Sequence, residues 1–418
     1  MANTDGMVGS LTRVKAFSQP VTVVLLTLLV VLFVSITTGF SVAGPEAVTS
    51  LIGTEDAILV VDPQGDISVA KNETTKLIPA SILKIFTSLV AFHYLGPDHR
   101  YQTEFFFDNN ANLKIKGYGD PRLTSEIVSE ISRLLAALIG KSTIVNDLIV
   151  DDTYFNQPLT IPGISSSSQP YDAPNGALCV NFNTVFFKKT PSGYVSAEPQ
   201  TPLLPYAQKK IIQRQEKSGR IVLSHVNHEN TVYAGKLFEY FLQQEGVQLN
   251  GDVRVGKVNH SHDKLIFRYP SRLTLTEIIS GLLEHSNNFT TNQLLISAGI
   301  KAYGPPGNLE KGVEAALAYA ARELALEDLE VAEGSGIYRH NRVSARQMMR
   351  VLEAFEPNYV LLRQQGRDFY KTGTLHGINT RAGYVASQNG GRYRYVVMVN
   401  TPGKSIRPIM RRLIKILD

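Results

Sequence analysis

The sequence predicts an α+β fold in which an antiparallel sheet flanked by helices is interrupted by a long β-rich insert. Three observations lead to this class. Strand-like runs occupy both ends of the chain that follows residue 43, helical spacing dominates the residues after 268, and short strand-like runs fill residues 101–267. A chain of 418 residues is also long enough for two or three domains with their own hydrophobic cores.

The composition is that of a globular protein and excludes several functions. Hydrophobic residues make up 43% and charged residues 19%, which excludes a disordered or collagen-like chain. The net charge of +5 suits an acidic surrounding such as an anionic envelope polymer but is too small to predict nucleic-acid binding. The single cysteine, Cys179, cannot form an intramolecular disulfide, and we expect it to be a small buried side chain.

The N-terminal residues 1–43 have the pattern of an export signal. Arg13 and Lys15 precede an apolar core that runs from Val21 to Ile36. About sixteen helical residues would reach roughly 24 Å, which is short of a hydrocarbon core of about 30 Å. The small residues at 41–43 favour cleavage by a signal peptidase, and the alternative is an uncleaved anchor in the inner membrane. Either form places the rest of the chain in the periplasm or an equivalent extracytoplasmic space.

Residues 46–100 form the first part of the predicted catalytic domain. A strand at 57–61, a turn at 62–65 and a strand at 66–70 predict a hairpin. Pro79 then begins a helix that Gly96 and Pro97 end, and its apolar spacing predicts one buried face.

After the insert at 101–267, in which we expect few helices, residues 268–418 form the second part of the same domain. Helical spacing recurs at 273–283, 308–326 and 344–355. Strands at 380–386 and 392–400 follow, joined by Asn389-Gly390-Gly391, and a basic helix at 407–417 ends the chain. The cations of that helix predict a solvated face and not a nucleic-acid site.

A serine three residues before a lysine is the first pattern with catalytic meaning, because on a helix the amine can take the proton of the hydroxyl. The pattern occurs three times, at Ser68 and Lys71, Ser81 and Lys84, and Ser261 and Lys264. Only Ser81 and Lys84 lie in a predicted helix, in its first turn, where the helix dipole favours an anionic transition state. Taken alone, the pair is better explained as an N-cap serine followed by a solvated lysine.

Two further patterns make a catalytic site the better interpretation. Ser286 and Asn288 follow a predicted helix, and Lys371-Thr372-Gly373-Thr374 stands before the C-terminal strands. The glycine allows a substrate backbone to approach closely. The order S-x-x-K, S-x-N, K-T-G is the signature of active-site serine enzymes that handle penicillin.

Longer runs resemble the class C, low-molecular-mass penicillin-binding proteins, which are D-alanyl-D-alanine carboxypeptidases. The resemblance covers residues 50–415, and this family carries an extra domain between its first two motifs that penicillinases lack. The runs that match family segments are 77–84 (PASxxK), 117–121 (GxGDP), 171–183 (YxAP with LxVNxN), 333–344 (DGSGLSRxNxVS) and 371–375 (KTGTL).

The resemblance implies a covalent mechanism without metal or cofactor. Ser81 would attack the carbonyl of the penultimate D-alanine, with Lys84 as its general base. Ser286 would relay a proton to the leaving group, and Asn288 would orient the acyl chain. β-Lactams would acylate Ser81 in the same way.

Substrate binding is implied by the same resemblance. Lys371, assisted by Thr372 and Thr374, would hold the terminal carboxylate of a peptidoglycan peptide that ends in D-Ala-D-Ala. The N–H groups of Ser81 and Thr374 would form the oxyanion hole. Asp151 matches an insert aspartate that would recognise the free amine of the stem peptide.

The chain departs from the family pattern at Asn287 and Glu333, where aspartate is usual, and neither position carries a chemical step. The leading hypothesis is an exported D-Ala-D-Ala carboxypeptidase that also cleaves peptidoglycan cross-links as an endopeptidase. The alternatives are a β-lactamase or esterase on the same fold, and a non-catalytic peptidoglycan-binding module. Histidine pairs at 225 and 228 and at 260 and 262 lack neighbouring carboxylate or cysteine clusters, so we expect surface histidines and no metal site.

Overall fold

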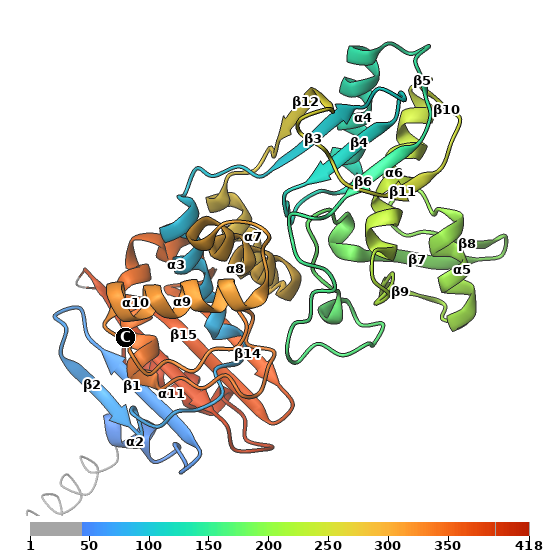
Figure 1. The fold of residues 1–418 in the computed structure, drawn as a ribbon. Coiled ribbons are helices and arrows are strands. Elements are labelled where there is room, and N and C mark those ends of the chain that lie inside the picture. Colours follow the sequence, from blue (N-terminus) through green and yellow to red (C-terminus); the bar gives the residue numbers. More distant parts are fainter. Residues whose placement is uncertain (1–43, 389, 418) are drawn as a thin grey trace, which may run out of the picture.

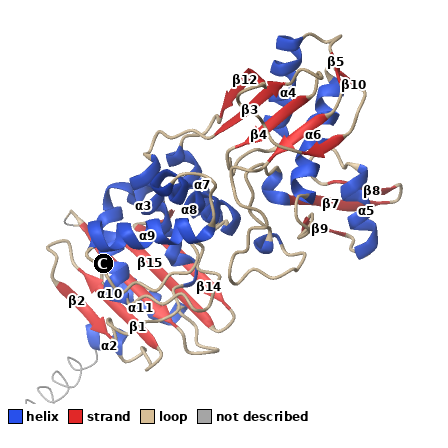
Figure 2. Cartoon of the chain, viewed as in Figure 1, coloured by secondary structure: helices blue, strands red, loops and turns tan. Residues whose placement is uncertain are grey.

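The computed structural model describes residues 44–388 and 390–417, so the predicted signal at 1–43 lies outside the described residues. Within the described residues, no helix combines the length and apolar character that a membrane span requires. Figure 1 shows two units, one that contains both ends of the described chain and one built from its middle. The α+β class predicted from the sequence is confirmed (Figure 2).

The first unit contains a six-stranded antiparallel sheet with the order β13-β14-β15-β16-β1-β2. The predicted hairpin supplies two of these strands, and its first strand pairs with the last strand of the chain, with Asp56 opposite Val399. The segments before and after the insert therefore contribute strands to the same sheet. The strands are β1 (Asp56–Val61), β2 (Ile67–Lys71), β13 (Arg363–Gln365), β14 (Asp368–Leu375), β15 (Ile378–Ala386) and β16 (Arg392–Val399).

Helices cover both faces of this sheet, which explains why β1 is apolar at almost every position. Leu59 and Val61 contact the core under the larger helical layer, whereas Ile58 and Val60 contact the core under the smaller one. The smaller layer is α2 (Pro45–Thr49) and α11 (Arg407–Ile416). The larger layer is α3 (Leu83–Leu95), α7 (Leu275–His285), α8 (Asn288–Tyr303), α9 (Leu309–Leu324) and α10 (Ala345–Phe355).

Two helices at the centre of the larger layer differ from the sequence-based expectation. Helix α3 was expected to bury one face, but it is buried at every residue from Leu83 to Ala91 because α8, α9 and α10 surround it. Helix α8 was not predicted. It is buried from Phe289 to Ile300, so it carries no polar stripe that would mark a helical period.

The insert is a separate unit with its own core, and the positions of its three helices were not predicted from the sequence. Three helices alternate with short strands, and a five-stranded sheet has the order β11-β6-β4-β3-β12. The sheet strands are β3 (Gln102–Phe107), β4 (Leu113–Gly117), β6 (Leu148–Asp151), β11 (Val253–Val255) and β12 (Lys264–Pro270). The remaining elements are β5 (Ile144–Val145), β7 (Thr184–Thr190), β8 (Gly193–Ser196), β9 (Ser218–Val222), β10 (Gln248–Leu249), α4 (Ser125–Ile139), α5 (Pro205–Arg214) and α6 (Glu229–Gln244).

The two units contact each other at the two linking segments and also elsewhere. The segments where the chain enters and leaves the insert lie side by side, because the Ser271 N–H donates to the Tyr101 carbonyl at 2.7 Å. In addition, the buried amide of Gln293 on α8 donates to the carbonyls of Gly119 and Gly176 in the insert, each at 3.0 Å. Two of the runs that match the family, 117–121 and 171–183, are therefore tied to the helix that begins with Asn288.

Candidate active site

Ser81 lies on a short 3₁₀ turn (Ala80–Ile82) that leads directly into α3. Ala80 has a positive φ of 48°, and two glycines pack against this turn. A Cβ on Gly336 would lie 2.0 Å from the Ala80 carbonyl oxygen, and one on Gly373 would lie 2.7 Å from the Ser81 nitrogen. Thr380 of β15 also donates to the Pro79 carbonyl at 2.7 Å. The turn is held from both sides, and only glycine fits at the contacts.

Lys84 connects Ser81 to the rest of the site. Its side chain has no exposed surface, its Nζ lies at hydrogen-bond distance from Ser81 Oγ, 2.9 Å, and it donates to Asn288 Oδ1 at 2.8 Å. A third hydrogen bond reaches the Ser335 carbonyl at 2.7 Å. The structure therefore brings three sequence-predicted residues into direct contact, and the solvated-lysine alternative for this pair is wrong.

A second serine–lysine pair lies beside the first. Ser286 is the left-handed residue between α7 and α8, with φ 56°, and it accepts a hydrogen bond from Lys371 Nζ at 2.8 Å. The sequence placed Lys371 before the C-terminal strands, but the residue lies within β14. Strand alternation buries Lys371 and Gly373 and leaves Thr372 and Thr374 exposed on the same strand.

The two lysines both have a lowered pKa. Burial lowers the pKa of Lys84 well below its ordinary value, and the charge of Lys371 lowers it further, against an opposing effect of Glu333. Burial also lowers the pKa of Lys371, to about 8. Burial therefore favours the neutral form of Lys84, which can act as a base, whereas Lys371 with a pKa of about 8 is mostly charged at neutral pH.

Glu333 is a site residue whose function the sequence did not indicate. Its buried carboxylate accepts hydrogen bonds from the N–H groups of Ser335 and Gly336, both at 2.6 Å, and from the amides of Asn292 and Asn341. These bonds fix the loop whose Ser335 carbonyl accepts from Lys84. The Glu-Gly-Ser-Gly run could have indicated this role in the sequence, because a carboxylate next to small residues can accept hydrogen bonds from their N–H groups.

The other departure from the family pattern has a structural explanation. Asn287 is the N-cap of α8, and its Oδ1 accepts from the Thr290 N–H at 2.8 Å. Asparagine and aspartate cap helices about equally well, so either residue starts this helix directly before Asn288.

Asp151 is not joined to the other candidate site residues. Its buried carboxylate accepts from Thr153 and from the Val258 N–H at 2.8 Å, and it forms an ion pair with Lys116 at 3.2 Å. Burial alone would raise the pKa of Asp151, but these partners together hold it below the ordinary value. Binding of a substrate amine by Asp151 stays a prediction.

The remaining candidates show no catalytic arrangement. Among the described residues, no group of three or more histidine, cysteine, aspartate or glutamate side chains could hold a metal ion. His228 instead contacts Asp152, with 3.0 Å between Nδ1 and Oδ2. Cys179 is buried, and burial raises the pKa of its thiol to about 12, so it is a poor nucleophile.

The two lysines predict how the acylation rate depends on pH. If Lys84 is the base it must be neutral, and if Lys371 binds a carboxylate it must be charged, so the rate should rise as Lys84 loses its proton and fall above about pH 8 as Lys371 does. The second-order rate of penicillin acylation, measured from pH 5 to 10, checks this. In a Lys371→Arg variant the alkaline fall should move beyond pH 10, since arginine stays charged. A fall near pH 8 that persists in the variant would contradict the assignment.

An antiparallel sheet with helices on both faces and an S-x-x-K serine in the turn before a central helix defines the class of penicillin-recognising serine enzymes. The model of the D-Ala-D-Ala carboxypeptidase 3 (S13) family matches residues 47–222 and 212–365. The chain belongs to this family, and it is an enzyme of the serine D-alanyl-D-alanine carboxypeptidase type.

Individual relatives agree with this family. The chain is 25% identical to a D-alanyl-D-alanine carboxypeptidase from Actinomadura sp. (strain R39), over 82% of this chain and 77% of that protein. It is 22% identical to the carboxypeptidase DacB of Haemophilus influenzae, over 81% and 83%. The crystal structure of penicillin binding protein 4 from H. influenzae covers 89% of this chain and 97% of its own, with a TM-score of 0.71 and 19% identity, which supports the fold.

Proposed function

We propose that Ser81 is the nucleophile and Lys84 the general base of a D-Ala-D-Ala carboxypeptidase that acts on peptidoglycan stem peptides outside the cytoplasm. The hydrogen bond of 2.9 Å between Lys84 Nζ and Ser81 Oγ, with the lysine fully buried, is the observation that carries this proposal. Burial keeps the amine neutral, and the short contact lets it accept the hydroxyl proton as the serine attacks.

The acylation step uses both serine–lysine pairs. As Ser81 Oγ bonds to the carbonyl carbon of the penultimate D-alanine, its proton moves to Lys84 Nζ. The oxyanion faces the N–H groups of Ser81 and Thr374, and each such donor is worth about 3–4 kcal/mol to the transition state. The scissile C–N bond then breaks, and the terminal D-alanine leaves as an amine after it takes a proton relayed through Ser286.

Binding and hydrolysis complete the cycle. Lys371, which Ser286 holds at 2.8 Å, supplies the positive field for the terminal carboxylate, with the hydroxyls of Thr372 and Thr374 beside it. Asn288 Oδ1 already accepts from Lys84, so its amide group is left to orient the acyl chain. Water then attacks the ester on Ser81, and the same lysine serves as base. A β-lactam enters the same path because its strained amide presents an equivalent carbonyl to Ser81.

Cleavage of cross-links requires the same chemistry with a longer leaving group. A predatory endopeptidase from Bdellovibrio bacteriovorus has the same fold at a TM-score of 0.50 and 16% identity. Because the leaving amine of a cross-link is also attached to a D-centre with a carboxylate nearby, we infer that the enzyme can act as a DD-endopeptidase as well.

Purified peptidoglycan fragments, analysed by mass spectrometry before and after treatment with the enzyme, test this function. Loss of terminal D-alanine from monomers is expected, with slower conversion of cross-linked dimers to monomers. Treatment with penicillin beforehand should stop both reactions and add one penicillin mass to the protein.

Each alternative gives a different result in this assay. Rapid loss of the penicillin mass without D-alanine release would indicate a β-lactamase. Binding of the fragments with no change in their mass would indicate a non-catalytic peptidoglycan-binding protein. Either outcome would overturn the proposed function.

A further inference from the structure

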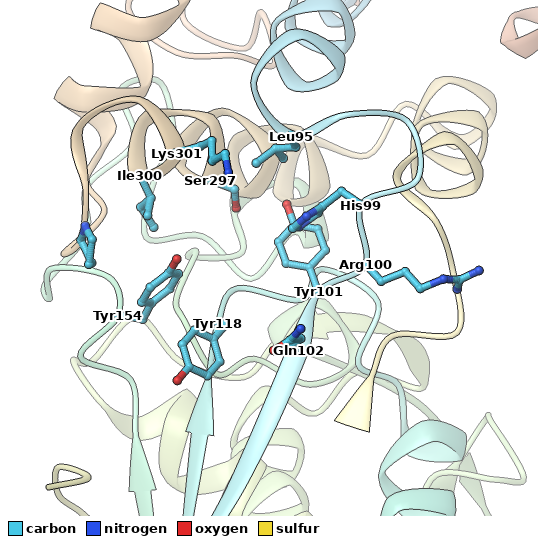
Figure 3. Close-up of a pocket in the computed structure, with 11 residues that line it drawn as sticks. Leu95, His99, Arg100, Tyr101, Gln102, Tyr118, Tyr154, Ser297, Ile300 and Lys301 are labelled. Carbon is cyan, nitrogen blue, oxygen red and sulfur yellow. The ribbon is translucent and has the colours of Figure 1, made fainter. Parts of the chain in front are cut away.

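A cavity of about 490 Å³ lies where helices α3 and α8 meet the insert (Figure 3), and Ser81 is not among the residues that line it. Leu95 at the end of α3 and Ser297, Ile300 and Lys301 on α8 form one side of it. Residues 99–102, which lead into β3 and include the basic residues His99 and Arg100, form the other side together with Tyr118 and Tyr154 of the insert. A volume of this size is within the usual range for small-molecule sites, which are commonly found between structural units.

The cavity contains a buried polar group without a well-formed hydrogen bond. Tyr101 is 3% exposed, and its hydroxyl makes no hydrogen bond of normal geometry among the described residues. Burial raises the pKa of Tyr101, and the Ser297 hydroxyl is close enough to oppose this rise as a weak partner. Figure 3 shows this hydroxyl directed toward the side of the cavity where Ser297 lies. The Ser297 hydroxyl itself donates to the Gln293 carbonyl at 2.8 Å. Buried polar groups in folded proteins are nearly always paired, so one without a well-formed hydrogen bond at a cavity wall indicates a missing partner.

The rest of the lining combines aromatic faces with hydrogen-bonding groups. The rings of Tyr118 and Tyr154 are half-buried and meet edge to face, with centroids 4.8 Å apart. Gln102 and Lys301 are exposed at the rim. No carboxylate lines the cavity. A pyranose ring matches these properties, because its axial C–H bonds pack on an aromatic face while its hydroxyl and acetamido groups reach polar side chains around the edge.

The position of the cavity links it to the active site. Helix α3 runs from the Ser81 turn to Leu95, and α8 runs from Asn288 to the far end that carries Lys301. At 1.5 Å per residue, the thirteen residues of α3 span about 20 Å. A stem peptide of four or five extended residues covers a similar length, at about 3.3–3.6 Å per residue.

From these observations we propose that the cavity is a saccharide site that binds one or two pyranose rings of the peptidoglycan glycan strand. The identity of the sugar rests on the proposed function, whereas the saccharide chemistry rests on the cavity itself. An occupant would contact both units and would hold the insert against the catalytic helices.

Binding of the peptide-free disaccharide N-acetylglucosaminyl-N-acetylmuramic acid to the full chain carrying Ser81→Ala tests this site without any turnover. Calorimetric titration should show saturable binding at one site. A Tyr154→Ala variant should bind at least tenfold more weakly, because it removes a stacking face. Gln102→Ala should weaken binding several-fold. Tyr240→Ala, which changes an exposed tyrosine on α6, is the matched control and should bind as the parent does.

Two results would overturn the proposal. One is the absence of saturable binding at 10 mM disaccharide, and the other is that the Tyr154→Ala and Gln102→Ala variants both bind the disaccharide as tightly as the parent does. Gln102 is exposed, so its variant remains informative if Tyr154→Ala lowers the melting temperature. The test is separate from the catalytic assignment. Disaccharide binding by a chain that releases no D-alanine refutes only the proposed function, and D-alanine release without disaccharide binding refutes only the saccharide site.

Discussion

A Ser81→Ala variant is expected to lose D-alanine release by a factor of at least about 10⁴ and to form no covalent adduct with penicillin. Lys84 cannot replace the lost nucleophile, because its amine is fully buried and is directed toward Asn288 and the Ser335 carbonyl. The substitution removes one hydroxyl and leaves the turn in place, so the melting temperature should change by only a few degrees. Fluorescent penicillin labelling and a D-alanine assay measure the effect.

The chain contains its own controls for this experiment. Ser68 and Ser261 also stand three residues before a lysine, but Ser68 lies on β2 and Ser261 in a turn before β12. Alanine at either position should leave labelling unchanged. Equal labelling of the Ser81→Ala variant, or loss of labelling in Ser261→Ala, would mean that the nucleophile lies elsewhere.

A Glu333→Gln variant should lower the free energy of unfolding by about 3 kcal/mol and the acylation rate by about 10²-fold. The amide is nearly the same shape, but the N–H groups of Ser335 and Gly336 donate to different oxygens of the carboxylate, so the NH₂ group of glutamine would face one of these two donors. At least one buried donor then loses its acceptor. The loop shifts, and Lys84 loses the Ser335 carbonyl that fixes its amine. Urea unfolding and penicillin acylation kinetics measure the two effects.

Glu327→Gln is the matched control, since Glu327 lies on the surface a few residues earlier in the chain. Its unfolding and its acylation rate should match those of the parent protein. If Glu333→Gln unfolds at the parent's urea concentration, the carboxylate does not organise this loop. Slower acylation without a loss of stability would instead assign Glu333 an electrostatic effect on Lys84 alone.

Local patterns in the sequence predicted the parts of the fold that have a clear period or a bounded apolar run. Helices α7, α9 and α10 have helical spacing, whereas β1 was recognised as a short apolar run bounded by a turn, and β15 and β16 as strand-like runs joined by a turn. The motif serines and lysines could be identified because their spacing on a helix or strand already carries chemical meaning. The resemblance to a family then supplied their roles.

The features that the sequence did not reveal depend on tertiary packing. Helix α8 has no polar face, so no period marks it, although it carries Asn288 and Gln293. Glu333 gains its importance from N–H groups that only the folded loop directs toward it. In the insert, helix α4 could have been predicted, because Val128, Ile131 and Leu135 have helical spacing. The short strand-like runs on either side led instead to the expectation of a region made mainly of strands.

The order of strands in the catalytic sheet has a consequence for the newly made chain. Ser81 and Lys84 are synthesised early, but β14, which supplies Lys371 and the Thr374 N–H, follows almost three hundred residues later, and β1 has no neighbour on one side until β16 exists. The insert, by contrast, can form its own core as soon as β12 has been made. A growing chain therefore carries the proposed nucleophile and base before Lys371 and the Thr374 N–H, the proposed carboxylate-binding group and oxyanion-hole donor, have been made. The last fifty or so residues complete the sheet and the active site. A chain that ends before them should therefore react with neither peptidoglycan nor penicillin.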